Sequence, residues 1–143
     1  MKDFASKYFT LQELTKSQTA RQRGLSNTPG PAATENLQDL VSHILDPLRR
    51  LWGSPLYVNS GYRSPAVNAA VGGAHNSQHT TGSAADITAG SPEANRRLLG
   101  LLLNQVMRLP FDQLIAEQCD SNGNPRWLHI SYSQHPRSQF LRT

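Results

Sequence analysis

Apolar positions follow a helical period in two long stretches of the chain. From Ala32 to Trp52 they recur every three or four residues, which predicts one long amphipathic core helix. Pro47 should bend or break the last turns of this helix, because proline lacks an N–H and clashes with the carbonyl group four residues earlier. A second long helix is predicted to open at Ser91-Pro92-Glu93 and to end at Pro110. Its buried face would consist of Leu98, Leu99, Leu101, Leu102, Val106 and Leu109.

Two shorter helices carry start signals. Thr10 followed by Glu13 is a capping-box pattern and predicts a helix from Leu11 to about Ser17. Ser64 followed by Pro65 predicts a brief helix that stops at the glycine pair 72–73. Between the first helix and Pro31 the chain is rich in turn-forming residues, which is typical of an ordered surface arm.

Four short apolar runs predict strands. They are Leu56–Ser60, Ala84–Ile87, Asp112–Glu117 and Trp127–Tyr132. The last two flank a turn-rich segment and predict a β-hairpin. The order of elements favours an α+β fold, with a small antiparallel sheet packed against the two longer helices. A length of 143 residues favours a single domain, 1–143.

The net charge of +4 and a pI of about 9.6 would suit an anionic partner, such as nucleic acid, phospholipid or an acidic cell-wall polymer. The basic residues are scattered along the chain, however, and the aromatic residues fall mostly at core-like positions, so a nucleic-acid-binding domain is disfavoured. No apolar run approaches the roughly 20 residues of a membrane span. The N-terminal residues also lack the apolar core of a signal peptide, so we expect no export by that route.

Polar chemistry concentrates in two segments, Ser77–Asp86 and Trp127–Tyr132. His79, Asp86 and His129 together offer two imidazole nitrogens and one carboxylate oxygen. With a fourth position left for water, this is the ligand count of a catalytic zinc site. Spacing alone is weak evidence, because a lone histidine in a strand is more often a core residue than a metal ligand, and both interpretations stay open at this point.

The run SGYRSPAVNAAVGGAHNSQHTTGSAADI, residues 60–87, resembles the signature of the zinc D-Ala-D-Ala carboxypeptidases and endopeptidases that cut peptidoglycan. That superfamily also contains D-Ala-D-Ala dipeptidases, many phage endolysins and the hedgehog domain. Its pattern is an arginine after a strand, then Ser-x-His with a glycine and an aspartate, and later Trp-x-His. The matching positions are Arg63, Ser77, His79, Gly82, Asp86, Trp127 and His129. The segments FTLQELTKSQTARQRGLSNTP and PFDQLIAE are similar to the short, single-domain branch carried by phages and prophages.

This resemblance implies a hedgehog/DD-peptidase-like fold in which His79, Asp86 and His129 bind one Zn²⁺. It implies that Arg63 binds a substrate carboxylate or the oxyanion, and that Ser77 hydrogen-bonds to the peptide; Tyr132 is a further candidate for substrate contact. The reaction implied is hydrolysis of an amide bond in peptidoglycan stem or cross-link peptides. The bond would be a D-Ala-D-Ala terminus, a D-Ala cross-link or L-Ala-D-Glu.

The general base is where the chain departs from the pattern. Many relatives place a glutamate three residues before the last zinc histidine, but this position is Arg126, and a guanidinium cannot accept a proton. Strand alternation puts Glu117 on the same face as Ile115, and the hairpin would bring it beside His129, so Glu117 is the predicted base. Asp112 is the alternative, and it would otherwise orient a ligand histidine or hold a substrate ammonium.

Four remaining residues are left out of the metal site. His75 is expected in a loop or at the substrate rim, His43 on a helix surface and His135 in the tail, and Cys119 has no histidine pattern near it. A phage- or prophage-type endolysin that acts as a monomer is the favoured function. It would stay in the cytoplasm until released to act in the periplasm or cell wall, without nucleic acid or membrane insertion. A catalytically silent, zinc-bound cell-wall recognition module is the alternative, which Arg126 keeps open.

Overall fold

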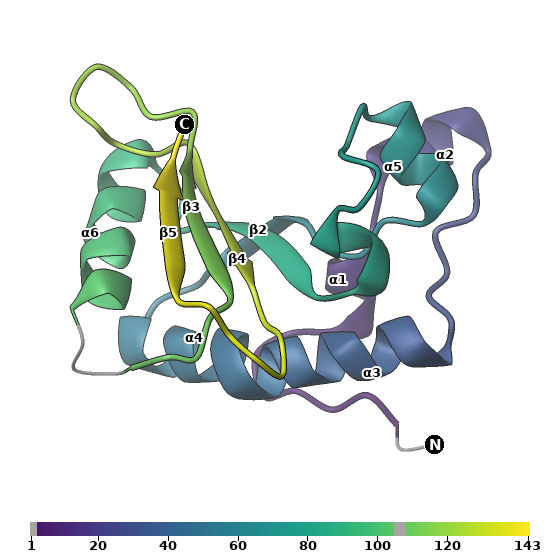
Figure 1. The fold of residues 1–143 in the computed structure, drawn as a ribbon, viewed down its shortest axis with the longest axis horizontal. Helices are drawn as coiled ribbons and strands as arrows, with labels where there is room; N and C mark the ends of the chain where they lie inside the picture. The colour runs from purple at the N-terminus through teal and green to yellow at the C-terminus, as the bar shows by residue number, and fades with distance from the viewer. Residues whose placement is uncertain (1–2, 105–107) are drawn as a thin grey trace.

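The computed structural model describes residues 3–104 and 108–143 and shows a mixed sheet flanked by helices (Figure 1). Within the described residues the sheet has five strands in the order β1-β2-β4-β3-β5. The strands are β1 (Tyr57–Ser60), β2 (Ala84–Thr88), β3 (Gln113–Glu117), β4 (Trp127–Ser131) and β5 (Gln139–Arg142). The helices are α1 (Leu11–Thr15), α2 (Gln18–Arg23), α3 (Pro31–Leu40), η1 (Val41–Leu45), α4 (Asp46–Trp52), α5 (Pro65–Ala70), η2 (Gln78–Thr81) and α6 (Pro92–Leu103).

The sheet confirms the predicted α+β fold class. β1 pairs with β2, β2 with β4 and β4 with β3, all antiparallel, and β3 and β4 form the predicted hairpin with Glu117 opposite Trp127. β5 was not predicted, and it pairs with β3 in parallel. The sheet is therefore not purely antiparallel. The sequence of β5, QFLR, is short and largely exposed, so it lacks the apolar alternation that marks a strand.

The long core helix runs through Pro47 without a break. α3, η1 and α4 follow one another directly, and the middle segment is π-helical, with the Asp46 N–H donating to the Val41 carbonyl. Such a widened turn makes room for the proline ring next to the preceding carbonyl groups. Pro47 then occupies the first turn of α4, where its missing N–H costs least. The helix is therefore not broken at Pro47, and the local adjustment is a π-helical segment that precedes the proline.

The predicted surface arm before Pro31 contains a short helix, α2. Ser17 caps this helix by accepting a hydrogen bond from the Ala20 N–H, so α1 stops at Thr15 instead of Ser17. Gly24 then ends α2 in the left-handed conformation, with φ 64°. Two of the turn-forming residues that predicted a loop, Gly24 and Gly30, are here helix caps.

The second long helix ends earlier than its apolar pattern predicts. α6 stops at Leu103, where Asn104 takes an extended conformation, rather than at Pro110. Leu109 is half-buried against the core, and Val106 lies outside the described residues. α5 begins at Pro65 with Ser64 as its cap, as predicted.

The core lies on one face of the sheet, and this leaves the other face for chemistry. Leu128 and Ile130 of β4 are fully buried, whereas Trp127 and His129, which alternate with them, are half-buried. The large side chains that fill the core come mainly from the long helix and the central strands: Leu37, Leu40, Ile44, Leu45, Leu48, Ile87, Leu98, Leu114, Leu128 and Ile130. In Figure 1, α6 covers one side of the sheet and the α3–α4 helix runs past its end. No helix of the described part of the chain is long and apolar enough to cross a membrane.

Candidate metal centre

The structure brings together the three residues predicted as metal ligands. The Nε2 atom of His79 lies 3.3 Å from Oδ1 of Asp86, and Nδ1 of His129 lies 3.1 Å from the same oxygen. One donor atom from each residue falls within 4.8 Å of the other two. His79 and Asp86 are buried and His129 is half-buried, so the cluster sits at the bottom of a depression in the sheet face.

The sheet register fixes two of the ligands. Asp86 on β2 and His129 on β4 are direct cross-strand partners. Side chains at such paired positions point to the same face, with Cβ atoms about 4.5–5.5 Å apart. The register of β2 against β4 is therefore sufficient to place the Asp86 carboxylate beside the His129 imidazole.

The third ligand comes from the short helical turn η2. Ser77 caps this turn by accepting a hydrogen bond from the His79 N–H, and Gly82 ends it with φ 78°. The Arg63 N–H donates to the His79 carbonyl at 3.0 Å and ties the turn to the segment after β1. Both backbone groups of His79, its N–H and its carbonyl, are thus held by hydrogen bonds.

A hydrogen bond to Gly61 sets the tautomer of His79. Nδ1 of His79 lies 2.7 Å from the Gly61 carbonyl oxygen, which only accepts hydrogen bonds. Nδ1 must therefore carry a proton, which leaves Nε2, 3.3 Å from Asp86 Oδ1, as the nitrogen of His79 that can bind a metal. A backbone carbonyl that orients a ligand histidine in this way is typical of metal sites.

Gly61 is expected to tolerate no side chain. A Cβ at this position would overlap the Leu14 carbonyl group, which also accepts the Tyr62 N–H at 2.7 Å. We expect Gly61→Ala to destabilise the fold by about 1–3 kcal/mol, as overpacking does, and to weaken metal binding because the His79 hydrogen bond moves. Chemical denaturation and competitive zinc titration measure the two effects.

Gly100→Ala is the matched control. Gly100 lies in α6, and a Cβ there would meet no atom within 4 Å. This variant should be neutral or more stable by about 0.5–1 kcal/mol, since alanine favours helix over glycine. Equal stability of the two variants would refute the steric argument for Gly61.

The protonation states of the cluster suit a divalent cation. Burial raises the pKa of Asp86, but hydrogen bonds with His129 and His79 outweigh burial and hold the pKa well below its ordinary value. An ionised carboxylate and two imidazole nitrogens, converging with no fourth such donor among the residues that the structure describes, match the three-ligand set of catalytic zinc sites. The donor chemistry of these residues therefore fits Zn²⁺.

The cluster opens into a hollow of about 520 Å³. The hollow is lined by side chains from several elements, among them Arg63, Ser77, Glu117, Trp127 and Arg137. Two arginines and one additional carboxylate thus share the hollow with the metal ligands. The two guanidinium groups can bind an anionic ligand, and the Glu117 carboxylate can accept a proton in the same hollow.

Arg63 is fixed beside the metal cluster. Its Nε donates to Ser60 Oγ at 3.1 Å and its Nη1 donates to Asn68 Oδ1 at 2.9 Å. Its Nη2 lies 3.7 Å from Asp86 Oδ2. The guanidinium is therefore held in one orientation toward the hollow, as a substrate-binding arginine requires.

Glu117 lies in the same hollow, one step along the sheet from the ligands. Ile115 is the cross-strand partner of His129, and Glu117 is the partner of Trp127, so Glu117 is a diagonal neighbour of His129 on the same face. Diagonal neighbours are about 7–8 Å apart, which leaves room for a water between a glutamate and a metal. Glu117 Oε1 accepts a hydrogen bond from Thr143 Oγ1 at 3.1 Å.

Tyr132 does not face the hollow. It follows β4 with the same parity as Leu128 and Ile130, so its side chain turns away from the face that carries His129. Its ring stacks on His43, with centroids 4.4 Å apart and planes 8° apart. The metal hollow therefore gives no support to the expected contact between Tyr132 and substrate, which stays a prediction.

Asp112 is engaged elsewhere and does not line the hollow. It is 3% exposed, and its carboxylate accepts hydrogen bonds from Arg137 Nε at 2.9 Å, Arg137 Nη2 at 2.8 Å and Gln78 Nε2 at 2.9 Å. The hydrogen bond with Arg137 is the main cause that lowers the pKa of Asp112 to about 2. A carboxylate engaged in this way is a weak proton acceptor near neutral pH, so the structure favours Glu117 over Asp112 as the predicted base.

The Asp112–Arg137 pair should make stability depend on pH. The pKa of Asp112 is lower in the folded chain than its ordinary value of 3.8, so the carboxylate contributes stability above about pH 4 that is lost as the pH falls through about 2. The difference in unfolding free energy between the wild type and Asp112→Asn should therefore shrink from pH 6 to pH 2. Glu35→Gln, an exposed change on α3, is the control, and a difference that stays constant with pH would contradict the expectation.

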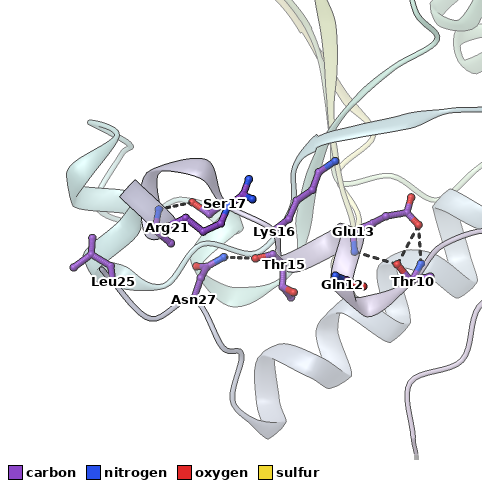
Figure 2. A pocket seen from close by; sticks show the side chains of 10 residues that line it. Thr10, Gln12, Glu13, Thr15, Lys16, Ser17, Arg21, Leu25 and Asn27 are labelled. Atoms are coloured by element: carbon purple, nitrogen blue, oxygen red, sulfur yellow. Dashed lines mark hydrogen bonds between the residues drawn. The ribbon is translucent and has the colours of Figure 1, made fainter. Parts of the chain in front are cut away.

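A second hollow, of about 540 Å³, lies beside α1 and α2 (Figure 2). Polar side chains in its lining form hydrogen bonds with backbone groups. Thr10 and Glu13 form a capping box, and Asn27 Nδ2 donates to the Thr15 carbonyl at 2.7 Å. The three metal ligands are not among its lining residues. We therefore treat it as part of the architecture and assign the chemistry to the metal hollow.

Sequence reasoning placed Arg137 only among scattered basic residues of the tail. Its presence in the hollow depends on β5, which pairs with β3 and brings the preceding residues to the rim. No motif around Arg137 signals this, because β5 has no strand pattern in the sequence.

The α+β fold and the His-Asp-His cluster, with a carboxylate and an arginine beside it, are the features of a metallopeptidase domain. The family model described as Peptidase M15 matches residues 7–108, and the chain belongs to this family, which confirms the resemblance. The match contains Arg63, His79 and Asp86 and ends before His129. The chain is also 47% identical over 62 residues to the zinc D-Ala-D-Ala carboxypeptidase of Streptomyces albus G. That similarity covers 42% of this chain and 24% of the relative.

Proposed function

We propose that this chain is a zinc peptidase that hydrolyses an amide bond in peptidoglycan peptides. The observation that carries the proposal is the convergence of His79, Asp86 and His129 within 4.8 Å in a hollow that also contains Glu117 and Arg63. Family membership and the name of the partial relative support the reaction class and the substrate class.

Three side chains would hold the metal. His79 would bind through Nε2, since its Nδ1 is committed to Gly61, and His129 through Nδ1, which faces Asp86. Bound zinc polarises a carbonyl group and lowers the pKa of its water to about 7. Asp86 offsets one of the two charges and is held by the sheet opposite His129.

Glu117 is the proposed general base. A carboxylate within reach of the attacking water accepts its proton and passes it to the leaving amine. Among the residues that line the hollow, Glu117 supplies the carboxylate that remains once Asp86 is assigned to the ligand set. Arg126, at the position where many relatives carry glutamate, is exposed and directs Nη1 toward Gln118 Oε1 at 3.4 Å.

Arg63 and Ser77 are proposed to bind the substrate. Arg63, held by Ser60 and Asn68, would clamp a substrate carboxylate or stabilise the oxyanion of the tetrahedral intermediate. Ser77 Oγ accepts a hydrogen bond from the His79 N–H, so its hydroxyl proton is directed elsewhere and would donate to the bound peptide.

We propose a lysis enzyme of the phage or prophage type as the biological setting. It would act as a monomer in the periplasm or cell wall, on a D-Ala-D-Ala terminus, a D-Ala cross-link or an L-Ala-D-Glu bond. The net charge of +4 would favour adsorption to an anionic wall.

Digestion of purified murein tests the proposal. The zinc-loaded protein should release new amino termini, whose identity by mass spectrometry defines the bond, and a chelator should stop the release. A protein that binds zinc stoichiometrically and binds murein, but releases no amino termini, would instead be the silent recognition module.

A further inference from the structure

Arg137 is a second arginine in the metal hollow, and the catalytic steps above do not use it. It comes from the loop before β5, and its side chain is 55% exposed. Exposed arginines usually sample many rotamers, and a rotamer must be fixed before a guanidinium can select a ligand. The residues around Arg137 fix the rotamer of its side chain.

The buried carboxylate of Asp112 holds the Arg137 guanidinium in a two-point contact. Nε donates to Oδ1 at 2.9 Å and Nη2 donates to Oδ2 at 2.8 Å, and the Arg137 backbone N–H donates to Oδ1 at 3.0 Å. Among the described residues, Nη1 makes no hydrogen bond. The edge of the guanidinium that carries Nε and Nη2 is therefore held by Asp112, and the N–H groups of Nη1 remain available to a ligand.

The same carboxylate connects Arg137 to the metal site. Gln78, next to ligand His79 in η2, donates from Nε2 to Asp112 Oδ2 at 2.9 Å. The Asp112 carboxylate thus hydrogen-bonds both to Arg137 and to η2, the turn that carries the ligand His79. Their relative position is set by the fold instead of by a flexible loop.

Arg137 and Glu117 lie toward opposite ends of β3. Ile115 is opposite His129, Glu117 is two residues further along, and Gln113 is two residues in the other direction, beside the loop that carries Arg137. Two residues of a strand span about 7 Å, which equals about two residues of an extended peptide. A peptide whose scissile amide sits at the metal would bring a side group or terminus within reach of Arg137.

We propose that Arg137 is a specificity-determining residue that binds a carboxylate of the substrate peptide, one or two residues from the scissile amide, on the side of the metal away from Glu117. This inference rests on the proposed peptidase function and narrows its substrate class to anionic peptides. A carboxylate is the group that a planar guanidinium with free N–H donors recognises best.

The test uses pairs of synthetic peptides that differ only by carboxylate or carboxamide at one residue near the bond found by murein digestion. For the wild type, amidation should raise KM about tenfold with kcat changed little, because one charge-assisted hydrogen bond is lost in ground state and transition state alike. In Arg137→Gln the ratio of the KM for the amidated peptide to the KM for the carboxylate peptide should fall to about one. Arg97→Gln, the same change on an exposed position of α6, should keep the wild-type ratio.

A double variant controls for the destabilisation that follows when Asp112 stays buried without Arg137 as its ion-pair partner. Asp112→Asn combined with Arg137→Gln replaces the ion pair by two amides and should also lose the discrimination while it melts as one cooperative unit. An unchanged ratio of KM values in a folded variant would overturn the proposal.

Equilibrium binding separates this proposal from the proposed function. Calorimetric titration of the same peptide pairs should show tighter binding of the carboxylate form by the wild type and no preference in Arg137→Gln, whether or not hydrolysis occurs. Absence of hydrolysis together with this preference would reject the peptidase and retain the anion site. Hydrolysis without any Arg137-dependent preference, or no peptide binding at all, would reject the anion site.

Discussion

Asp86→Asn is expected to abolish stoichiometric zinc binding and to lower peptide hydrolysis by at least about 10³-fold. Asp86 supplies the only negative charge among the three ligands, and its Oδ1 lies 3.1–3.3 Å from both histidine nitrogens. A bound metal supplies several kcal/mol of transition-state stabilisation, and each 1.36 kcal/mol corresponds to a factor of ten in rate. Zinc content by atomic absorption and murein digestion measure both losses.

Asp39→Asn is the matched control for this change, since Asp39 lies on α3 and does not line the metal hollow. It should keep zinc and activity. Circular dichroism of the metal-free proteins separates loss of the ligand from loss of the fold. An Asp86→Asn protein that folds, binds one zinc with wild-type affinity and hydrolyses murein normally would refute the assignment of the ligands.

Glu117→Gln is expected to lower kcat by about 10²–10⁴-fold while zinc content stays at one ion per chain. Glutamine keeps the size of the side chain but cannot accept the proton of the attacking water, and general-base catalysis contributes a factor of this size. Glu117→Ala should behave in the same way. Rates at saturating substrate, with zinc measured on the same samples, test the expectation.

Glu93→Gln on α6 controls for the loss of one exposed carboxylate. It should leave kcat unchanged. Full activity of Glu117→Gln would mean that Glu117 is not the general base. Loss of zinc from Glu117→Gln would instead make Glu117 a structural support of the site.

Local patterns predicted most of the fold, because each depends on nearby residues. The capping box at Thr10 and Glu13, the cap at Ser64 and the hairpin of β3 and β4 all lie where the sequence places them. β5 and the π-helical segment before Pro47 were missed. β5 is stabilised by pairing with a distant strand, and η1 is an adjustment of hydrogen bonds inside a continuous helix.

The candidate site was predictable to the extent that motif and strand parity specify it. The resemblance supplied His79, Asp86 and His129, and alternation put Glu117 on their face of the sheet. The same alternation gives Tyr132 the phase of Leu128 and Ile130, so it argues against a place for Tyr132 on that face. Arg137 and the ion pair that occupies Asp112 depend on tertiary contacts, which periodicity does not encode.

Because Asp86 and His129 form one rung of the β2–β4 ladder, the spacing between these ligands does not depend on the length of the chain that connects them. The turn at 120–124, at the tip of the hairpin, is accordingly a place where extra residues can be inserted for tethering or fusion without stretching the coordination sphere. A slip of one residue between these strands, by contrast, would send the two ligands to opposite faces. Metal retention would then report directly on correct strand pairing in any such engineered variant.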